Sequence, residues 1–390
     1  MIPFFEYDAI VVGCGLTGAV ISRELADVGQ KVLIVERRNH IAGNMYDYLN
    51  EEGVLVQKYG PHTFHTNDKE LFEYMDKFEE WEEYKLTCGA MIDGKYTPTP
   101  FNFKTIDDFY SDEDARRLKD EIKKEFGDAE FATVVELLNH NNEMIRQYAE
   151  FLFEKDYSLY TAKQWGVKPS EVDSSILKRV PIRFSYKEGY FEDKYQVMPK
   201  NSFVSFFDRL LDSENINCVL DEDINKYVEL REGGIYFNSK LYSGNVVYTG
   251  PIDELFDLRY GKLPYRSLRF EWISEEIESF QEAPVVAYPQ HPEFTRITEY
   301  TKIPYQDVGN KTTYAVEYSI PYQKDCELEP YYPVLTDSSN EIYEKYLSEV
   351  NKYEKLFVCG RLGDFKYYNM DQALKRALEV SRCIIERIKR

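Results

Sequence analysis

The chain has 390 residues, of which 43% are hydrophobic and 30% charged, and this predicts a globular protein of two or three domains around a shared site. Acidic residues outnumber basic residues by 69 to 48, which gives a formal net charge of −21. A surface this acidic repels nucleic acid and anionic membranes, because both are bound through clustered Lys and Arg. An anionic small substrate would therefore depend on a few local arginines.

The sequence contains no signal for export or membrane insertion. A strand begins by about Tyr7, which leaves no room for a signal peptide, and no apolar run reaches 18 residues. The six cysteines are scattered without a CxxC pair, so we expect buried thiols in a reducing compartment. We therefore expect a cytoplasmic protein that neither inserts into membranes nor binds nucleic acid.

The first 36 residues predict a βαβ unit. Residues 7–13 and 31–36 are nearly all-apolar strands, and residues 17–28 form the helix between them. The turn GCGLTG at residues 13–18 lets the backbone approach a pyrophosphate at the N-terminus of the helix. Glu36 at the end of the second strand can accept hydrogen bonds from a ribose diol. Together these features predict a dinucleotide-binding site.

A helical segment follows, from about Ile106 to Trp165, where apolar residues recur with a period of 3.6. Ser111 and an acidic first turn begin one helix, which ends at Gly127, and residues 133–155 continue the pattern. We predict that this segment is a small helical domain inserted into the α/β core.

The second half of the chain alternates between two kinds of strand. Residues 186–197 and about 267–317 contain short alternating runs that predict an antiparallel sheet. Residues 245–250 and 355–360 resemble the buried strands at the start, and a last helix begins at about Asp371. The nucleotide-binding domain is therefore predicted to be discontinuous, an arrangement that is commoner in FAD proteins than in NAD dehydrogenases.

A second glycine-rich turn, residues 360–363, also favours FAD over NAD. It leads toward another helix N-terminus, which a long flavin nucleotide that spans the site would use. The alternative is an ordinary strand–helix loop.

The predicted fold class is α/β: a discontinuous FAD-binding Rossmann-like domain with an inserted helical domain and an antiparallel β-sheet domain. The ranges are 1–75, 200–250 and 350–390 for the Rossmann-like domain, 106–178 for the helical domain with a substrate lid, and 76–105, 179–199 and 251–349 for the antiparallel sheet and substrate domain.

Seven motifs, in this order, resemble those of the prokaryotic UDP-galactopyranose mutases. They are GPHTFHT (60–66), PTPFNF (98–103), YTAKQWG (160–166), KRVPIRF (178–184), TRITE (295–299), PYYP (330–333) and GRLGDFKYYNMD (360–371). The resemblance implies interconversion of UDP-galactopyranose and UDP-galactofuranose on reduced FAD, through a covalent adduct between flavin N5 and the sugar and without net redox. It also implies a homodimer, and a reductant such as NAD(P)H that only activates the flavin.

Two other interpretations stay open. An FAD-linked oxidoreductase of the same fold, acting on a nucleotide sugar, would explain the cofactor motifs. A non-catalytic module that binds flavin or a nucleotide sugar would also explain them. Neither the physiological reductant nor the presence of a 2-acetamido group on the sugar follows from the sequence.

The catalytic residues implied by the resemblance are two arginines and two histidines. Arg179 and Arg296 match the arginines that hold the pyrophosphate, because a guanidinium stays ionised and binds phosphate oxygens in a fork. Arg183 lies four positions after Arg179 and could be confused with it. His62 and His65 lie in a loop that the resemblance places against the flavin, and a metal is not expected because no third ligand is near.

The remaining implied contacts are polar, aromatic or glycine residues. Substrate contacts would be Asn102, Tyr160, Thr161, Trp165, Tyr190, Tyr332, Tyr367 and Asn369. Cofactor contacts would be Gly13, Gly15, Thr17, Gly18, Glu36, Arg37, Asn44, Gly360, Arg361, Asn369 and Met370. For each tyrosine, the alternative is core packing with a satisfied hydroxyl.

Two positions depart from the pattern of the family, and one segment is predicted to move. Asp156 replaces an aromatic residue, so Tyr157 or Phe153 would stack on uracil instead. Val197 stands where glycine is expected. Residues 166–180 are predicted to be a lid that closes when pyrophosphate meets Arg179.

Overall fold

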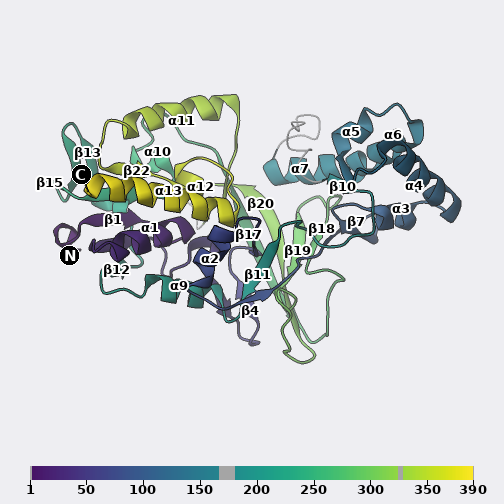
Figure 1. Cartoon of the computed structure of the whole chain (residues 1–390), viewed down its shortest axis with the longest axis horizontal. Coiled ribbons are helices and arrows are strands. Elements are labelled where there is room, and N and C mark those ends of the chain that lie inside the picture. The colour runs from purple at the N-terminus through teal and green to yellow at the C-terminus, as the bar shows by residue number, and fades with distance from the viewer. Residues whose placement is uncertain (1, 167–180, 324–327, 390) are drawn as a thin grey trace.

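The computed structural model describes residues 2–166, 181–323 and 328–389. Along its long axis, Figure 1 shows a sheet with helices at one end, antiparallel strands in the middle and a group of helices at the other end. The N- and C-terminal segments lie together at the first of these ends.

Five strands form a parallel sheet in that first end. Their order is β12 (Ile216–Val219), β2 (Val32–Val35), β1 (Ala9–Val12), β16 (Asn245–Tyr248) and β22 (Leu356–Val358). The strands come from three distant stretches of the chain, and all lie inside the ranges predicted for the Rossmann-like domain. The discontinuous α/β core is therefore confirmed, whereas the domain boundaries stay a prediction.

Helices cover both faces of the parallel sheet. One face carries α1 (Leu16–Asp27), α9 (Phe203–Leu211) and α13 (Met370–Ile388), and the other carries α10 (Ile252–Leu255) and α11 (Asp337–Val350). Within β1, Val11 packs in the core on the first of these faces and Ile10 in the core on the second, because successive side chains of a strand point to opposite faces. Because α11 packs here, we propose that the sheet domain ends near residue 336.

A second, seven-stranded sheet occupies the middle of the molecule. Its order is β21 (Tyr332–Pro333), β17 (Tyr265–Glu275), β20 (Thr312–Pro321), β19 (Arg296–Glu299), β18 (Val285–Ala287), β7 (Cys88–Ile92) and β8 (Lys95–Thr99). All neighbours are antiparallel except β18 and β7, which run parallel. The strands predicted within residues 267–317 are confirmed.

The strand predicted over residues 186–197 is wrong for most of its length. Only its end is extended, as β11 (Tyr195–Pro199), which pairs with β5 (Phe64–Thr66) and β6 (Trp81–Glu83) in a separate sheet. The preceding residues form a loop because their backbone groups bond elsewhere. The Arg183 guanidinium donates to the Gly189 carbonyl, and the Tyr190 N–H donates to the Leu86 carbonyl.

The predicted helical segment is confirmed, with interruptions. It contains α3 (Phe103–Phe109), α4 (Asp112–Phe126), α5 (Val134–Leu138), α6 (Glu143–Leu152), a π-helical turn (Phe153–Tyr157) and α7 (Ser158–Trp165). As predicted, the Ser111 hydroxyl caps α4 and Gly127 ends it with a positive φ. The break before α6 comes from Asn142, whose side chain caps that helix by accepting from the Met144 N–H. Two strands, β9 (Phe131–Thr133) and β10 (Pro181–Arg183), pair beside these helices.

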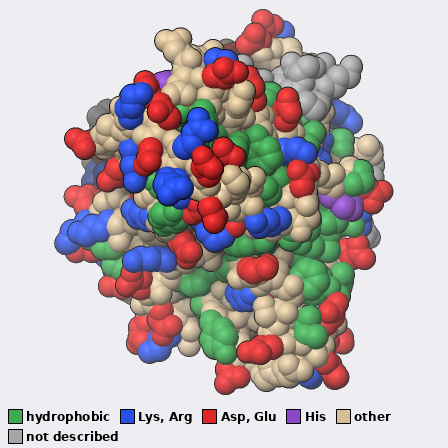
Figure 2. Space-filling view, turned by 90° about the vertical axis from the view of Figure 1, so that its right-hand side faces the viewer, with side chains coloured by type: hydrophobic (Ala, Val, Ile, Leu, Met, Phe, Trp, Pro, Cys, Tyr) green, Lys and Arg blue, Asp and Glu red, His purple; other side chains and the backbone are tan. Residues whose placement is uncertain are grey.

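On the face of the molecule shown in Figure 2, acidic and basic side chains are interspersed.

The other helices and strands are α2 (Lys69–Asp76), α12 (Gly360–Gly363), β3 (Asp47–Leu49), β4 (Leu55–Gln57), β13 (Val228–Arg231), β14 (Gly234–Phe237) and β15 (Lys240–Leu241). Within the described ranges, no helix is both long and apolar enough to cross a bilayer.

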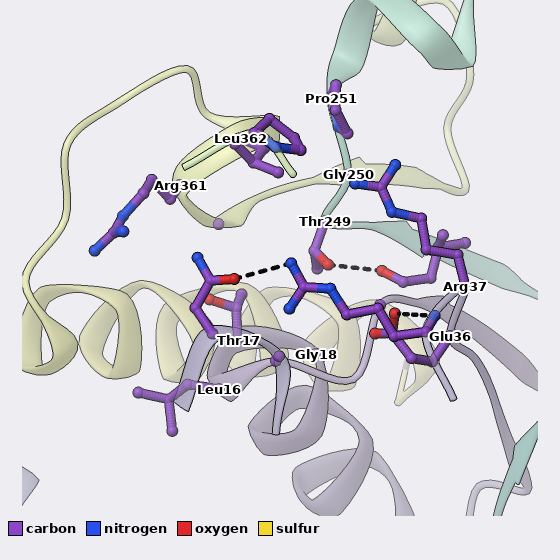
Figure 3. Close-up of a pocket in the computed structure, with 18 of the residues that line it drawn as sticks. Leu16, Thr17, Gly18, Glu36, Arg37, Thr249, Gly250, Pro251, Arg361 and Leu362 are labelled. Carbon is purple, nitrogen blue, oxygen red and sulfur yellow. Dashed lines mark hydrogen bonds between the residues drawn. The ribbon is translucent and has the colours of Figure 1, made fainter. Parts of the chain in front are cut away.

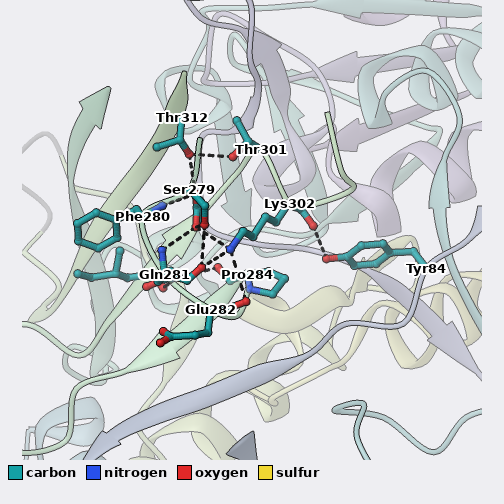
Figure 4. Close-up of polar contacts among 11 residues, drawn as sticks. Tyr84, Ser279, Phe280, Gln281, Glu282, Pro284, Thr301, Lys302 and Thr312 are labelled. Atoms are coloured by element: carbon teal, nitrogen blue, oxygen red, sulfur yellow. Dashed lines mark hydrogen bonds and ion pairs between the residues drawn. The ribbon is translucent and has the colours of Figure 1, made fainter. Parts of the chain in front are cut away.

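A buried carboxylate fixes the loop that enters β18. Glu299 is fully buried and accepts hydrogen bonds from the N–H groups of Phe280 (2.8 Å) and Gln281 (3.1 Å). The Lys302 ammonium lies 3.2 Å from the same carboxylate and bonds the Gln281 carbonyl, and its own carbonyl accepts from Tyr84 (Figure 4). This network holds the loop beside the strand that carries Arg296.

Candidate active site

A pocket lies beyond the carboxyl ends of the parallel strands, where two glycine-rich turns face each other (Figure 3). It is lined by the turn after β1, the end of β2, residues 249–251 after β16, and residues 360–362 after β22. All eleven predicted cofactor contacts line this pocket, and so does His62. The carboxyl edge of a parallel sheet is the usual place for a ligand in such folds.

Two glycines make the close approaches that a pyrophosphate site requires. A Cβ on Gly18 would lie 2.0 Å from the Gly13 carbonyl oxygen, so only glycine lets α1 pack against this turn. Gly43 has a φ of +54°, and a Cβ there would lie 2.7 Å from Gly15 Cα. The N-terminus of α1 has no side-chain cap, so its N–H groups stay available to an anion.

The Glu36 carboxylate is held in place at the end of β2. One oxygen accepts from the Cys14 N–H (2.7 Å) and the other from the Arg38 N–H (2.9 Å). The Arg38 guanidinium donates to the Asn44 side chain and lies over the Tyr59 ring. Because each carboxylate oxygen has a second lone pair, Glu36 still offers acceptors to a ribose.

His62 lies in the same pocket and is neutral near pH 7. Burial lowers the pKa of His62 to about 4, with help from the positive charges of Arg361 and Arg296. Its Nδ1 lies 2.8 Å from the Gly60 carbonyl oxygen, which can only accept, so Nδ1 carries the proton. Nε2 therefore presents a lone pair and can accept a hydrogen bond.

Arg296 and Glu317 form an ion pair between a partly exposed guanidinium and a buried carboxylate on adjacent strands, β19 and β20. Two guanidinium nitrogens of Arg296, Nε and Nη2, lie 2.9 and 2.8 Å from the same oxygen of Glu317. Glu317 is 1% exposed, and its other oxygen has no hydrogen-bond partner among the described residues. The arrangement holds the guanidinium in one orientation and leaves Nη1 outside this ion pair.

Four of the predicted tyrosines lie near Arg296 or Arg361. Burial raises the pKa values of Tyr160, Tyr190 and Tyr332, and the charge of Arg296 lowers all three, so each of these hydroxyls lies within electrostatic reach of that guanidinium. The Tyr332 ring stacks on Tyr367 with centroids 5.5 Å apart, and Arg361 lies 5.3 and 5.4 Å from the two centroids. The result is a polar, aromatic cluster, which Arg361 joins to the dinucleotide pocket and whose chemistry suits a phosphate and a sugar.

Two predicted site residues are placed elsewhere. His65 does not line the pocket; its Nδ1 bonds Asp193 (2.8 Å) and its ring stacks on Phe191. Asn102 is 1% exposed, and its side chain caps α3 by accepting from the Lys104 N–H. It lines a separate cavity that also contains Arg183. The roles assigned to His65 and Asn102 therefore stay predictions without support from this arrangement.

Other predictions fall partly or wholly outside the described residues. Arg179 and residues 167–180 of the predicted lid lie there, as does the side chain of Trp165. Thr161 is described and is buried on α7. Val197 fills the core between β5 and β6, so the larger side chain is accommodated by packing.

Two residues that the structure adds to the site, Glu317 and Gln57, were not predicted. Glu317 lies within an alternating strand, and nothing in its local pattern marks it as the partner of Arg296. Gln57 contacts His62 twice through its side-chain amide, once as acceptor and once as donor. The contact of Glu317 depends on the pairing of β19 with β20, and that of Gln57 on the conformation of the turn between residues 57 and 62, and neither is visible in the local sequence pattern.

Comparison with known proteins shows which family models and which relatives this chain is similar to. A family model described as UDP-galactopyranose mutase matches residues 155–367, more than half of the chain, and a model of NAD(P)-binding Rossmann-like domains matches residues 11–78. A UDP-galactopyranose mutase from Mycoplasma pneumoniae is 32% identical over 96% of this chain and 95% of its own length. A dTDP-fucopyranose mutase from Escherichia coli is 31% identical over 97% and 98%.

Similarity to solved structures supports the fold. The crystal structure of a reduced UDP-galactopyranose mutase aligns with a TM-score of 0.68 at 16% identity, over 97% of this chain and 94% of that one. A putative protoporphyrinogen oxidase from Exiguobacterium aligns with a TM-score of 0.62 at 12% identity, over 97% and 98%. The fold is thus shared with proteins of other names, and the site must distinguish between activities.

Proposed function

Since the chain belongs to the UDP-galactopyranose mutase family, we propose that it interconverts UDP-galactopyranose and UDP-galactofuranose with reduced FAD as its cofactor. One observation carries the proposal. His62 and Arg361 line the dinucleotide pocket, Arg361 also lies 5.3 and 5.4 Å from the ring centroids of Tyr332 and Tyr367, and the charge of Arg296 acts on both His62 and Tyr332. A guanidinium able to bind a diphosphate therefore lies beside the place where a flavin would end.

The residues of the pocket fit FAD. The close approach of Gly15 and Gly43 and the uncapped N-terminus of α1 would hold the pyrophosphate, and Glu36 would hold the ribose. Asn369 and Met370, at the start of α13, would line the flavin end. When bound and reduced, the flavin would supply a nucleophilic nitrogen toward the anomeric carbon of the sugar.

Side chains of the protein would bind and orient the substrate and stabilise its leaving group. Arg296 would hold the diphosphate as substrate and as leaving group, because its charge is fixed in place by Glu317. Neutral His62 would accept a hydrogen bond at Nε2. The hydroxyls of Tyr332 and Tyr367, whose rings stack on each other, would bind phosphate or sugar oxygens.

A second substrate is favoured by one comparison. The dTDP-fucopyranose mutase is nearly as similar to this chain as the UDP-galactopyranose mutases are, over nearly its whole length. The same reaction on a deoxysugar linked to a thymidine diphosphate is therefore the alternative function.

One experiment separates these possibilities. The flavin-loaded protein is reduced with dithionite and incubated separately with UDP-galactose, UDP-N-acetylgalactosamine and dTDP-fucose, and the ring isomers are resolved by chromatography. The proposal expects furanose from UDP-galactose without stoichiometric consumption of reductant. A requirement for one reductant per turnover would indicate an oxidoreductase, and binding of UDP without any furanose would indicate a binding module.

The proposed role of the cofactor and the assembly can be checked on the same preparation. Replacement of FAD by 5-deaza-FAD should abolish turnover, and NAD(P)H should be able to replace dithionite as the activating reductant. Light scattering should give the mass of a homodimer.

A further inference from the structure

The side chain of Lys163 is surrounded by three carbonyl groups of one turn. Lys163 lies on α7, three residues after Tyr160, and its ammonium donates to the carbonyls of Tyr288 (2.8 Å), His291 (2.5 Å) and Phe294 (2.7 Å). An ammonium has three N–H donors, and each is used here. Lys163 is half-buried, so these bonds are partly shielded from water.

The turn that provides these carbonyls connects β18 to β19. Arg296 is the first residue of β19, two positions after Phe294. The turn is also held internally, because the Tyr288 N–H donates to the Thr295 carbonyl and the His291 ring stacks on Phe294. Three converging carbonyls repel one another unless a cation or donor lies between them, so the conformation of this turn depends on Lys163 as well as on Gln290, whose side chain bonds Asp93.

The C-terminal end of α7 is fixed separately to the same sheet. The Gln164 carbonyl accepts from Arg266 on β17 (3.1 Å) and from the Ser319 hydroxyl on β20 (2.8 Å). These bonds set where the helix ends. They do not contact the turn between β18 and β19, so Lys163 alone among the residues described on α7 bonds that turn.

We propose that Lys163 is a positioning residue for nucleotide binding, because it ties the helix that carries Tyr160 to the strand that carries Arg296. The inference rests on the proposed function, in which Arg296 binds the diphosphate and Tyr160 the nucleoside end. The spacing between these two groups must match one nucleotide diphosphate, and the carbonyl contacts of Lys163 set that spacing. Burial lowers the pKa of Lys163 to about 8, so the cation is present at neutral pH.

The test replaces Lys163 with methionine, which keeps the length of the side chain and removes the donors, in the full flavin-loaded protein. UDP is the probe, and its Kd is measured by calorimetry alongside KM and kcat. The loss of hydrogen bonds from a charged donor should raise the Kd of UDP and the KM by about tenfold or more, with flavin content unchanged and a smaller change in kcat. Lys124→Met is the control, because Lys124 lies on α4 and pairs with Glu121 of the same helix at the surface.

The outcomes separate this inference from the proposed function. If the wild type binds no UDP and forms no furanose, the proposed function fails. If the wild type is active and Lys163→Met binds UDP as tightly, only the positioning role is overturned. If Lys163→Met loses its flavin or its fold, Lys163→Gln, which retains two donors, is judged by the same criterion. Failure of both variants to fold would show a purely structural role and overturn the inference.

Discussion

Replacing Arg296 by alanine changes two properties at once, and the structure shows how to separate them. The change removes the proposed diphosphate ligand and also the partner of Glu317, which is 1% exposed and has one oxygen that no described residue bonds. An uncompensated buried charge of this kind costs about 3–5 kcal/mol. The single variant should therefore lose stability for a reason unrelated to catalysis.

The double variant Arg296→Ala/Glu317→Gln removes the charge and keeps the shape of the partner. We expect its melting temperature to lie above that of Arg296→Ala, measured by thermal unfolding of the flavin-loaded proteins. Its kcat/KM should nevertheless fall by roughly 10²–10³, because loss of a preorganised ligand removes about 2–4 kcal/mol of transition-state stabilisation.

The value of kcat/KM tests the role of Arg296, and the melting temperature tests the role of Glu317. A double variant with kcat/KM near that of the wild type would show that Arg296 does not hold the diphosphate. A double variant no more stable than the single one would show that Glu317 is not the source of the instability. Lys58→Ala serves as the control for loss of a positive charge, because Lys58 is exposed beside the Tyr59 ring.

Three further changes test other parts of the site. Gly43→Ala should lower the ratio of flavin to protein absorbance, because its Cβ would lie 2.7 Å from Gly15 Cα; full flavin occupancy would argue against a cofactor at this turn. Arg183→Ala should lower the free energy of unfolding in urea by about 2 kcal/mol, since Arg183 is 5% exposed and bonds backbone carbonyls, and a weakened Kd for UDP would instead make it a ligand. Burial raises the pKa of Asp156 from 3.8 to about 7, so its contribution to stability is full below pH 3.8 and is lost as the pH rises through 7. Asp156→Asn should therefore lose less stability than the wild type between pH 5 and pH 8 in thermal unfolding, and equal losses would contradict the burial of this carboxyl.

The parts of the fold that were predicted correctly have local causes. Apolar runs predicted the strands β1, β2, β16 and β22, and caps such as Ser111 and Gly127 predicted the limits of α4. The loop before β11 was missed because its backbone bonds the Arg183 side chain at Gly189 and, at Tyr190, the carbonyl of the distant Leu86. The parallel pairing of β18 with β7 joins residues nearly 200 positions apart and has no local signal.

In the site too, features encoded in consecutive residues were predicted, whereas features that depend on tertiary packing were missed. The glycine turns were predictable because their chemistry is encoded in consecutive residues. Two histidines of a single motif were given one role, yet only His62 lines the pocket. His65 lies on β5 between Phe64 and Thr66, which are both buried, so its side chain points to the opposite face. Which face is turned to the pocket is decided by tertiary packing, and Glu317 was missed for the same reason.

The order of the parallel strands has a consequence during synthesis. The strand β22 lies at one edge of the parallel sheet. The pocket is lined by residues 360–362 and 368–370 as well as by the turn at residues 13–18. A ribosome adds about 5–20 residues per second, so roughly 20 seconds or more separate the translation of the first turn from that of the second. During that interval β16 has an unpaired edge and α1 lacks α13, on which it packs. A nascent chain that ends before residue 356 should therefore be unable to retain a dinucleotide, and the cofactor would be acquired only after nearly the whole chain has been translated.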